Sequence, residues 1–125
     1  MSTIAEVRTE LQNSMRDQVR LCPTADVEEG TPVAVDAEGF PPLVAYRVDS
    51  DYFVTDNRCT HGNGMLSDGF QDGDQIECPF HGGAFDIRTG AATVFPCQKA
   101  VRSYPVELEG GWITIPSQMR QAAGD

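Results

Sequence analysis

The sequence predicts a mainly β domain built from short antiparallel strands, and three observations support this. The chain of 125 residues contains 12 Gly and 8 Pro, which favour frequent turns. Short segments rich in Val, Ile, Thr and Tyr recur between these turn residues, as expected of strands. A Gly-Gly pair, Gly110-Gly111, separates two alternating segments and is typical of a hairpin. The length suits one domain with its own core.

The first twenty residues show the only helical pattern. Between residues 3 and 20, apolar side chains recur at helical spacing with polar residues between them, at Ile4, Val7, Leu11, Met15 and Val19. We therefore expect residues 1–20 to form a short N-terminal helix, an extension of the main domain. Its apolar stripe would pack on the domain or dock a partner, and a weakly ordered extension is the third reading.

The main domain is expected to cover residues 21–116. Its predicted strands, bounded by Gly or by turns rich in Asp and Ser, are residues 31–35, 43–48, 52–55, 106–109 and 112–115. Residues 57–97 form a loop-rich insertion between them. Residues 117–125 form a polar tail. The chemistry of the chain is concentrated in the insertion.

The net charge and the distribution of apolar residues limit which partners the chain is expected to bind. The formal net charge is −10, with 19 acidic and 9 basic residues, so nucleic acid and anionic membranes are not expected to bind. The charge either favours a partner with a positive patch or only keeps the chain soluble. No segment approaches the roughly 20 apolar residues that cross a bilayer. The charged residues 1–15 lack the apolar core of a secretory signal, so we expect a cytoplasmic protein.

Two short motifs in the insertion form a complete metal-ligand set. Cys59-Thr60-His61 is followed, after sixteen intervening residues, by Cys78-Pro79-Phe80-His81. The two histidines are the only ones in the chain. Two thiolates and two imidazoles would satisfy either zinc or an iron–sulfur cluster.

The order of the ligands favours the cluster. Classical zinc fingers group Cys with Cys and His with His, whereas each loop here contributes one Cys and one His. That arrangement suits a dinuclear centre, in which each loop sends one ligand to each metal. Glycines adjoin the motifs at 62, 64, 82 and 83 and allow the backbone to approach cluster sulfurs closely.

These motifs resemble the Rieske signature, C-x-H and C-P-x-H-G. The run from Cys78 to Gly90, CPFHGGAFDIRTG, is similar to the second cluster loop of Rieske ferredoxins that serve bacterial aromatic-ring-hydroxylating dioxygenases. The similarity continues through residues 100–106 and 110–115 and covers roughly residues 20–116. It implies a Rieske fold: an antiparallel β-sandwich-like base carrying a cluster-binding subdomain at about residues 57–97.

The resemblance also implies a cofactor, its ligands and its partners. One [2Fe–2S] cluster would be bound through Cys59 and Cys78 on the inner iron and His61 and His81 on the outer iron. The chain would be a non-catalytic, one-electron carrier. A flavin-dependent reductase would supply the electron, and the terminal oxygenase of an aromatic dioxygenase system would receive it, both through transient contacts.

Three positions predict a low potential. High-potential Rieske proteins have a disulfide where this chain has Gly64 and Phe80, and a hydrogen-bonding Ser where it has Gly83. Without these features we expect a potential near the bottom of the Rieske range, which spans roughly −150 to +300 mV. Such a potential suits a carrier between a reductase and an oxygenase.

Several absences exclude other activities. Both histidines are already assigned to the cluster, so none remains for a mononuclear oxygenase iron. No G-x-G-x-x-G motif indicates binding of NAD or FAD. The alternatives are a small Rieske subunit of another redox system, such as nitrite reductase, a zinc-stabilised interaction module, or a Rieske-like subunit without a cluster.

Two cysteines and one dipeptide lie outside the ligand motifs. Cys22 and Cys97 are expected to be buried thiols, with a disulfide between them as the alternative. Phe95-Pro96 is expected in a third loop that shields the cluster, or else in an ordinary turn before a strand.

Overall fold

The computed structural model describes residues 17–120, except 61, 63 and 81. Its strands form three antiparallel sheets with the orders β1-β11-β10, β2-β3-β4-β9 and β5-β6-β7-β8. Their bounds are β1 Gln18–Pro23, β2 Val33–Val35, β3 Leu43–Val48, β4 Asp51–Asp56, β5 Phe70–Asp72, β6 Gln75–Glu77, β7 Ala84–Asp86, β8 Ala92–Val94, β9 Ser103–Tyr104, β10 Glu107–Glu109 and β11 Trp112–Pro116. Three single-turn 3₁₀ helices complete the described part: η1 Thr24–Asp26, η2 Leu66–Asp68 and η3 Ser117–Met119.

The mainly β class and the strands predicted from sequence are confirmed. The strand expected at 43–48 is β3, and β4 begins one residue before the expected 52 and ends one after 55. The hairpin of β10 and β11 turns at Gly110 and Gly111, which have φ values of 56° and 85°. Both glycines adopt the left-handed region that this two-residue turn requires.

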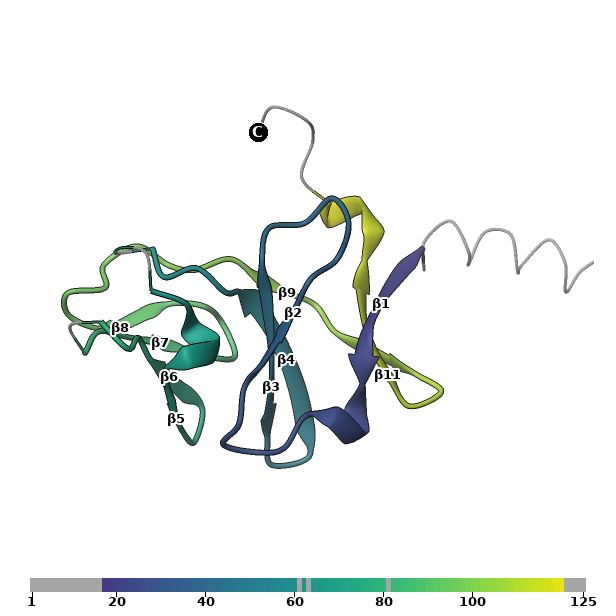
Figure 1. Cartoon of the computed structure of the whole chain (residues 1–125), viewed down its shortest axis with the longest axis horizontal. Coiled ribbons are helices and arrows are strands. Elements are labelled where there is room, and N and C mark those ends of the chain that lie inside the picture. The colour runs from purple at the N-terminus through teal and green to yellow at the C-terminus, as the bar shows by residue number, and fades with distance from the viewer. Residues whose placement is uncertain (1–16, 61, 63, 81, 121–125) are drawn as a thin grey trace, which may run out of the picture.

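Strand β3 joins two hydrophobic cores. Leu43 and Ala45 face a core formed with the sheet of β1, β11 and β10, whereas Val44 and Tyr46 face the core of the β5–β8 sheet. Alternate side chains of a strand point to opposite faces, so its continuous apolar run is buried on both sides. Figure 1 shows the same order in space, with β5–β8 on one side of β3 and β1 and β11 on the other.

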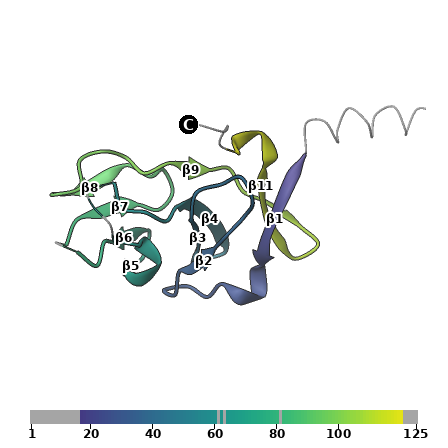
Figure 2. The same cartoon turned by 45° about the horizontal axis from the view of Figure 1, so that its top comes forward.

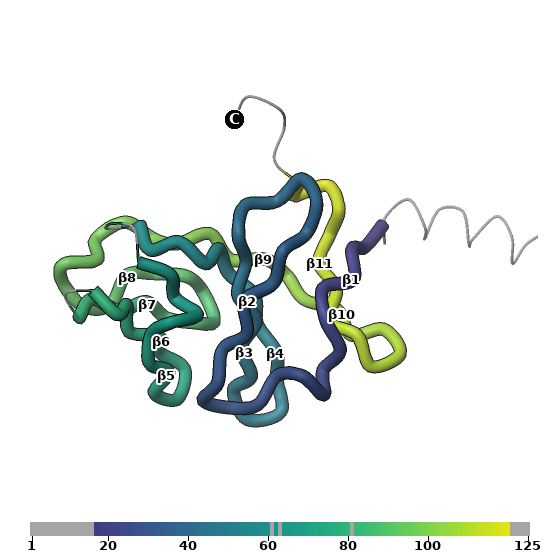
Figure 3. Tube along the Cα trace, viewed as in Figure 1, coloured from purple at the N-terminus to yellow at the C-terminus, as the bar shows by residue number. Residues whose placement is uncertain are grey.

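The β5–β8 sheet belongs to one excursion of the chain. The chain leaves the middle sheet after β4 and returns to it at β9, which pairs directly with β4. Figure 2 and the Cα trace in Figure 3 show this excursion as a lobe at one end of the molecule. The chain between β4 and β9 thus forms a lobe with its own four-stranded sheet, in which loops surround short strands.

The predicted N-terminal helix is wrong where it can be compared with the structure. Residues 18–20 belong to β1, which pairs with β11 from Gln18↔Pro116 to Pro23↔Trp112. Val19 and Leu21 pack on the core shared with β11. Val19 fits a helical stripe and an alternating strand equally well, and the pairing with a distant strand decides between them. Residues 1–16 lie outside the described part.

Residues 117–120, the first part of the predicted polar tail, contact the domain. Met119 packs against the core of the base. The Arg120 side chain donates a hydrogen bond of 2.9 Å from Nε to the Glu38 carbonyl and lies over the Phe40 ring. Residues 117–120 therefore pack against the domain, and residues 121–125 of the predicted tail lie outside the described part. No helix among the described residues is long and apolar enough to span a bilayer.

Asp56 at the end of β4 is expected to make stability depend on pH. Its carboxylate accepts a 2.6 Å hydrogen bond from the Tyr104 hydroxyl. Burial raises the pKa of this carboxyl, against the opposing effects of that hydrogen bond and of Arg102. Because the folded pKa lies above the unfolded value of about 3.9, the stabilisation is complete below that value and is lost as pH rises through the folded pKa.

Asp56→Asn should remove this dependence, since the amide stays neutral and its oxygen still accepts from Tyr104. The unfolding free energy of the variant minus that of the wild type should rise from pH 4.5 and then level off, as measured by urea titration up to pH 8. Asp51→Asn, at the exposed start of the same strand, is the control. A constant difference across this range for Asp56→Asn would contradict the prediction.

Candidate metal centre

Two loops of equal length carry the predicted cysteine ligands. Residues 59–64, the first loop, and residues 78–83, the second loop, each begin with Cys and end with Gly. An antiparallel residue pair flanks each loop where it begins and ends. This pair is the bridge Arg58↔Met65 for the first loop and Glu77↔Ala84 of β6 and β7 for the second.

An equivalent backbone hydrogen bond closes each of the two loops. The Cys59 N–H donates to the Gly64 carbonyl at 2.8 Å, and the Cys78 N–H donates to the Gly83 carbonyl at 2.7 Å. Each cysteine is therefore held at the same place in the same kind of loop. The two cysteines are brought together, with 2% exposure each, in the core of the lobe.

The loops touch each other at Gly64. A Cβ added there would lie 3.0 Å from Cys78 Sγ and 3.5 Å from the Phe80 ring. The end of the first loop therefore packs against the ligand sulfur of the second, and only a residue without a side chain leaves this approach unhindered. Gly64 therefore lets the two loops approach each other closely, whereas the approach of the backbone to the cluster sulfurs stays a prediction.

Asn57 positions the first loop and was not identified from sequence. Its side chain is buried, accepts a 2.7 Å hydrogen bond from the Ser67 N–H and donates to the Ser67 hydroxyl at 3.0 Å. Its carbonyl accepts from the Leu66 N–H. Asn57 thus anchors η2 behind the loop. An Asn directly after a strand and two residues before a ligand motif was the available signal.

A third segment, residues 95–99, lies beside the first loop. The Thr60 hydroxyl donates a 2.6 Å hydrogen bond to the Lys99 carbonyl, and Cys97 Sγ lies 3.7 Å from Cys59 Sγ. Phe95 is exposed, whereas Cys97 is buried. The segment is therefore a neighbour of the first loop, and shielding of the cluster by Phe95-Pro96 stays a prediction. Cys22 and Cys97 are buried thiols outside any disulfide, as predicted.

Burial governs the chemistry of these thiols. It raises the pKa of Cys78, an effect that Cys59 reinforces and that a hydrogen bond from the Phe80 backbone opposes. Burial is also the largest cause that raises the pKa of Cys97 to about 12, followed by its hydrogen bond with Cys59. A metal cation is what holds a buried thiol as a thiolate. The pair of Cys59 and Cys78 therefore suits metal binding.

The histidine ligands cannot be placed in the same way. His61 and His81 lie outside the described residues. Among the residues that the structure does describe, no three His, Cys, Asp or Glu side chains converge on one metal ion. The structure thus brings together the two predicted sulfur ligands of the set.

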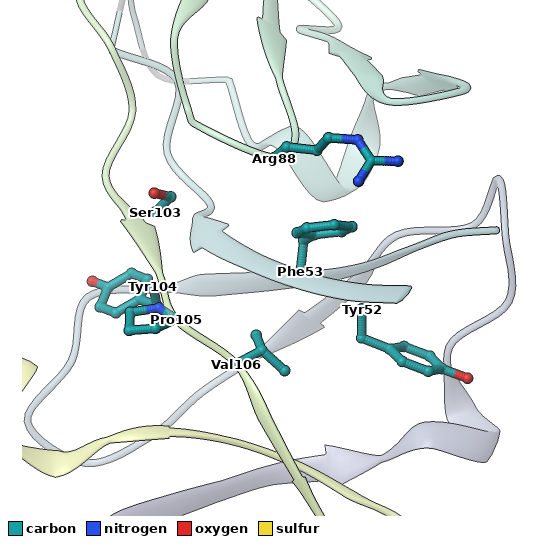
Figure 4. A pocket seen from close by; sticks show the side chains of 7 residues that line it. All are labelled: Tyr52, Phe53, Arg88, Ser103, Tyr104, Pro105 and Val106. Atoms are coloured by element: carbon teal, nitrogen blue, oxygen red, sulfur yellow. The ribbon is translucent and has the colours of Figure 1, made fainter. Parts of the chain in front are cut away.

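A groove between the lobe and the base contains none of the predicted ligands. It has a volume of about 380 Å³ and is lined by Tyr52, Phe53, Arg88, Ser103, Tyr104, Pro105 and Val106. Figure 4 shows Arg88 above the Phe53 ring, 5.1 Å from its centroid. Arg88 belongs to the turn after β7, so this contact ties the lobe to β4.

The residues present fit a Rieske cluster: two buried, adjacent sulfur donors in matching loops, with glycines that leave room for close approach. Such a cluster supplies one-electron redox chemistry when bound.

Residues 17–105 match the family model described as the Rieske [2Fe-2S] domain, and the chain belongs to this family. It is 45% identical over 102 residues to the ferredoxin component of the p-cumate 2,3-dioxygenase system of Pseudomonas putida, which covers 81% of this chain and 86% of the relative.

Solved structures agree with this assignment. The Sphingomonas yanoikuyae B1 ferredoxin has a TM-score of 0.79 and 59% identity, covering 80% of this chain and 98% of its own. A chain in a complex of reduced oxygenase and oxidized ferredoxin of carbazole 1,9a-dioxygenase has a TM-score of 0.74 and 39% identity. The match covers 79% of the present chain and 92% of the chain in that complex. The predicted Rieske fold, cluster type and family are therefore confirmed.

Proposed function

We propose that this chain is a cytoplasmic one-electron carrier that accepts electrons from a flavin-dependent reductase and passes them to the terminal oxygenase of an aromatic-ring-hydroxylating dioxygenase system. The observation that carries the proposal is the pair of matching loops that bury Cys59 and Cys78 side by side. Relatives named as ferredoxin components of dioxygenase systems support the choice of an oxygenase as the partner.

The ligand set is proposed as Cys59 and Cys78 on the inner iron and His61 and His81 on the outer iron. Burial of the two sulfurs supports the inner assignment, because an iron held by them would lie within the lobe. Two neutral imidazoles in place of two thiolates make the centre less negative and ease its reduction relative to a cluster with four cysteines.

The surface beside the ligand loops supports a transient contact. Phe80, between Cys78 and His81, is 51% exposed, and Phe95 in the neighbouring segment is 75% exposed. Large exposed aromatic side chains are enriched where proteins dock. The surface beside the ligand loops therefore includes an apolar component at Phe80 and Phe95. The net charge of −10 favours partners with a positive docking face.

The test is reconstitution of electron transfer. Protein prepared without oxygen should contain two iron and two sulfide per chain, as a [2Fe–2S] cluster requires, and should give a reddish-brown colour. When reduced, it should show the anisotropic, low-average-g resonance of a Rieske centre. It should then sustain turnover of an aromatic dioxygenase when mixed with the reductase and terminal oxygenase of the p-cumate, naphthalene or carbazole type.

The rival functions predict different results. A zinc-stabilised module would be colourless and would contain zinc in place of iron. A nitrite reductase subunit would contain the Rieske centre but would support nitrite reduction and fail with every oxygenase. Either result would contradict the proposal.

A further inference from the structure

Cys97 is a buried thiol beside the proposed cluster site, but it is outside the proposed ligand set. It is 4% exposed and belongs to the same core as Cys59 and Cys78. Its sulfur lies 3.7 Å from Cys59 Sγ, within the range of a hydrogen bond between two sulfurs. Cys22, the other remaining cysteine, lies in the core of the base, a different core from that of Cys59 and Cys78.

The position of Cys97 is set by the end of the second loop. A Cβ added to Gly83 would lie 2.5 Å from Cys97 Sγ and 2.9 Å from its backbone nitrogen. The Cys97 sulfur therefore occupies the space that a side chain at residue 83 would need. The Cys97 N–H donates to the Val94 carbonyl at 3.1 Å, which holds this segment against the end of β8. The sulfur is thus wedged between Gly83 and Cys59.

We infer that Cys97 donates an S–H···S hydrogen bond to the Cys59 sulfur when the cluster is bound, which raises the reduction potential. This inference rests on the proposed ligation by Cys59. A ligand thiolate has no proton to give, so the donor in this pair is Cys97. Cys97 is a positioning and tuning residue, since it acts through a ligand and does not itself hold iron.

The direction of the effect follows from charge. Reduction adds one electron to the cluster and makes its ligand sulfurs more negative. A donor aimed at one of those sulfurs therefore stabilises the reduced state more than the oxidised state. The dry core of the lobe strengthens this difference, because little solvent screens it.

Replacement of the donor should lower the potential. Cys97→Val keeps most of the volume and removes the S–H. It should decrease the equilibrium constant for reduction about fivefold, which is about 40 mV for a one-electron couple. Cys97→Ser keeps a donor and should retain a potential at or above that of the wild type. Cys22→Val makes the same chemical change in the other core and should leave the potential unchanged.

Potentials are measured by spectroelectrochemical titration of chains with full iron and sulfide content, and resonance Raman spectra report the Fe–S(Cys) stretching frequencies. These frequencies should shift in Cys97→Val and stay unshifted in Cys22→Val. If Cys97→Val binds less iron, Cys97→Ala, which only removes atoms, provides the same measurement.

The inference is overturned if Cys97→Val or Cys97→Ala has the wild-type potential, or if Cys97→Ser falls as far as the variants without a donor. Failure of the proposed function looks different, because the wild-type chain itself would then lack the Rieske spectrum.

Discussion

Cys78→Ala should yield a chain that cannot hold the cluster. The substitution removes one of two buried sulfur donors and leaves Cys59 without its counterpart from the second loop. Metal binding to such a site depends on the full donor set, so iron content should fall at least about tenfold. The visible absorption and the resonance of the reduced centre should disappear with it, as measured on protein purified without oxygen. Cys59→Ala should have an equal effect, because the two loops hold their cysteines in the same way.

The matched control is Cys22→Ala. Cys22 is also a buried thiol, 8% exposed, but it lies in β1 and contributes to the core of the base. Its truncation costs packing energy without removing a proposed ligand. Full iron content and an unchanged resonance are therefore expected in the control. The same outcome in Cys78→Ala would remove Cys78 from the ligand set and with it the assignment of the second loop. His81→Ala should also lose most of the cluster.

The largest effect on stability is expected from Gly90→Ala in the turn between β7 and β8. Gly90 has a φ of 84°, and an added Cβ would lie 2.1 Å from the Val101 carbonyl oxygen. That atom belongs to the backbone and cannot rotate away. The turn is held from both sides, because the Gly90 N–H donates to Asp86 and its carbonyl accepts from Val101. We expect a loss of about 3 kcal/mol or more in the free energy of unfolding, measured by denaturant titration.

Gly30→Ala separates the two causes of this loss. Gly30 has nearly the same φ, 89°, but no atom lies within 4 Å of an added Cβ. It should therefore bear only the backbone strain of a side chain in the left-handed region, about 1 kcal/mol. The difference between the two variants measures the steric overlap with Val101. Equal losses in the two variants would show that the overlap relaxes without cost.

Local signals were sufficient for much of the fold. The run Leu43–Val48 predicts a strand because it is rich in apolar and aromatic residues, with Arg47 as its one charged residue, and it is the strand shared by both cores. Gly110-Gly111 predicts a hairpin because few other residues adopt the backbone of that turn, and β10 and β11 form it. In both cases the information lies within a few consecutive residues.

The candidate site was predictable to a similar extent. The spacing of Cys59 and Cys78 within two matching motifs indicated two loops around one centre, and the structure brings these sulfurs together. Asn57 and Cys97 were not predicted as parts of this neighbourhood. Their roles depend on Ser67, Gly83 and Cys59, and the contact from Cys97 crosses 38 residues of sequence.

The sequence by itself determined the turns and the strands, because these depend on the chemistry of neighbouring residues, and the resemblance of its two motifs to the Rieske signature indicated the type of metal centre. Only the tertiary structure decided that Gln18–Pro23 is a strand, that residues 117–120 pack on the base and that a third sulfur lies beside Cys59. The physical reason is that pairing and packing energies come from partners far away in the chain, and they outweigh the weak local preference of segments such as residues 18–20.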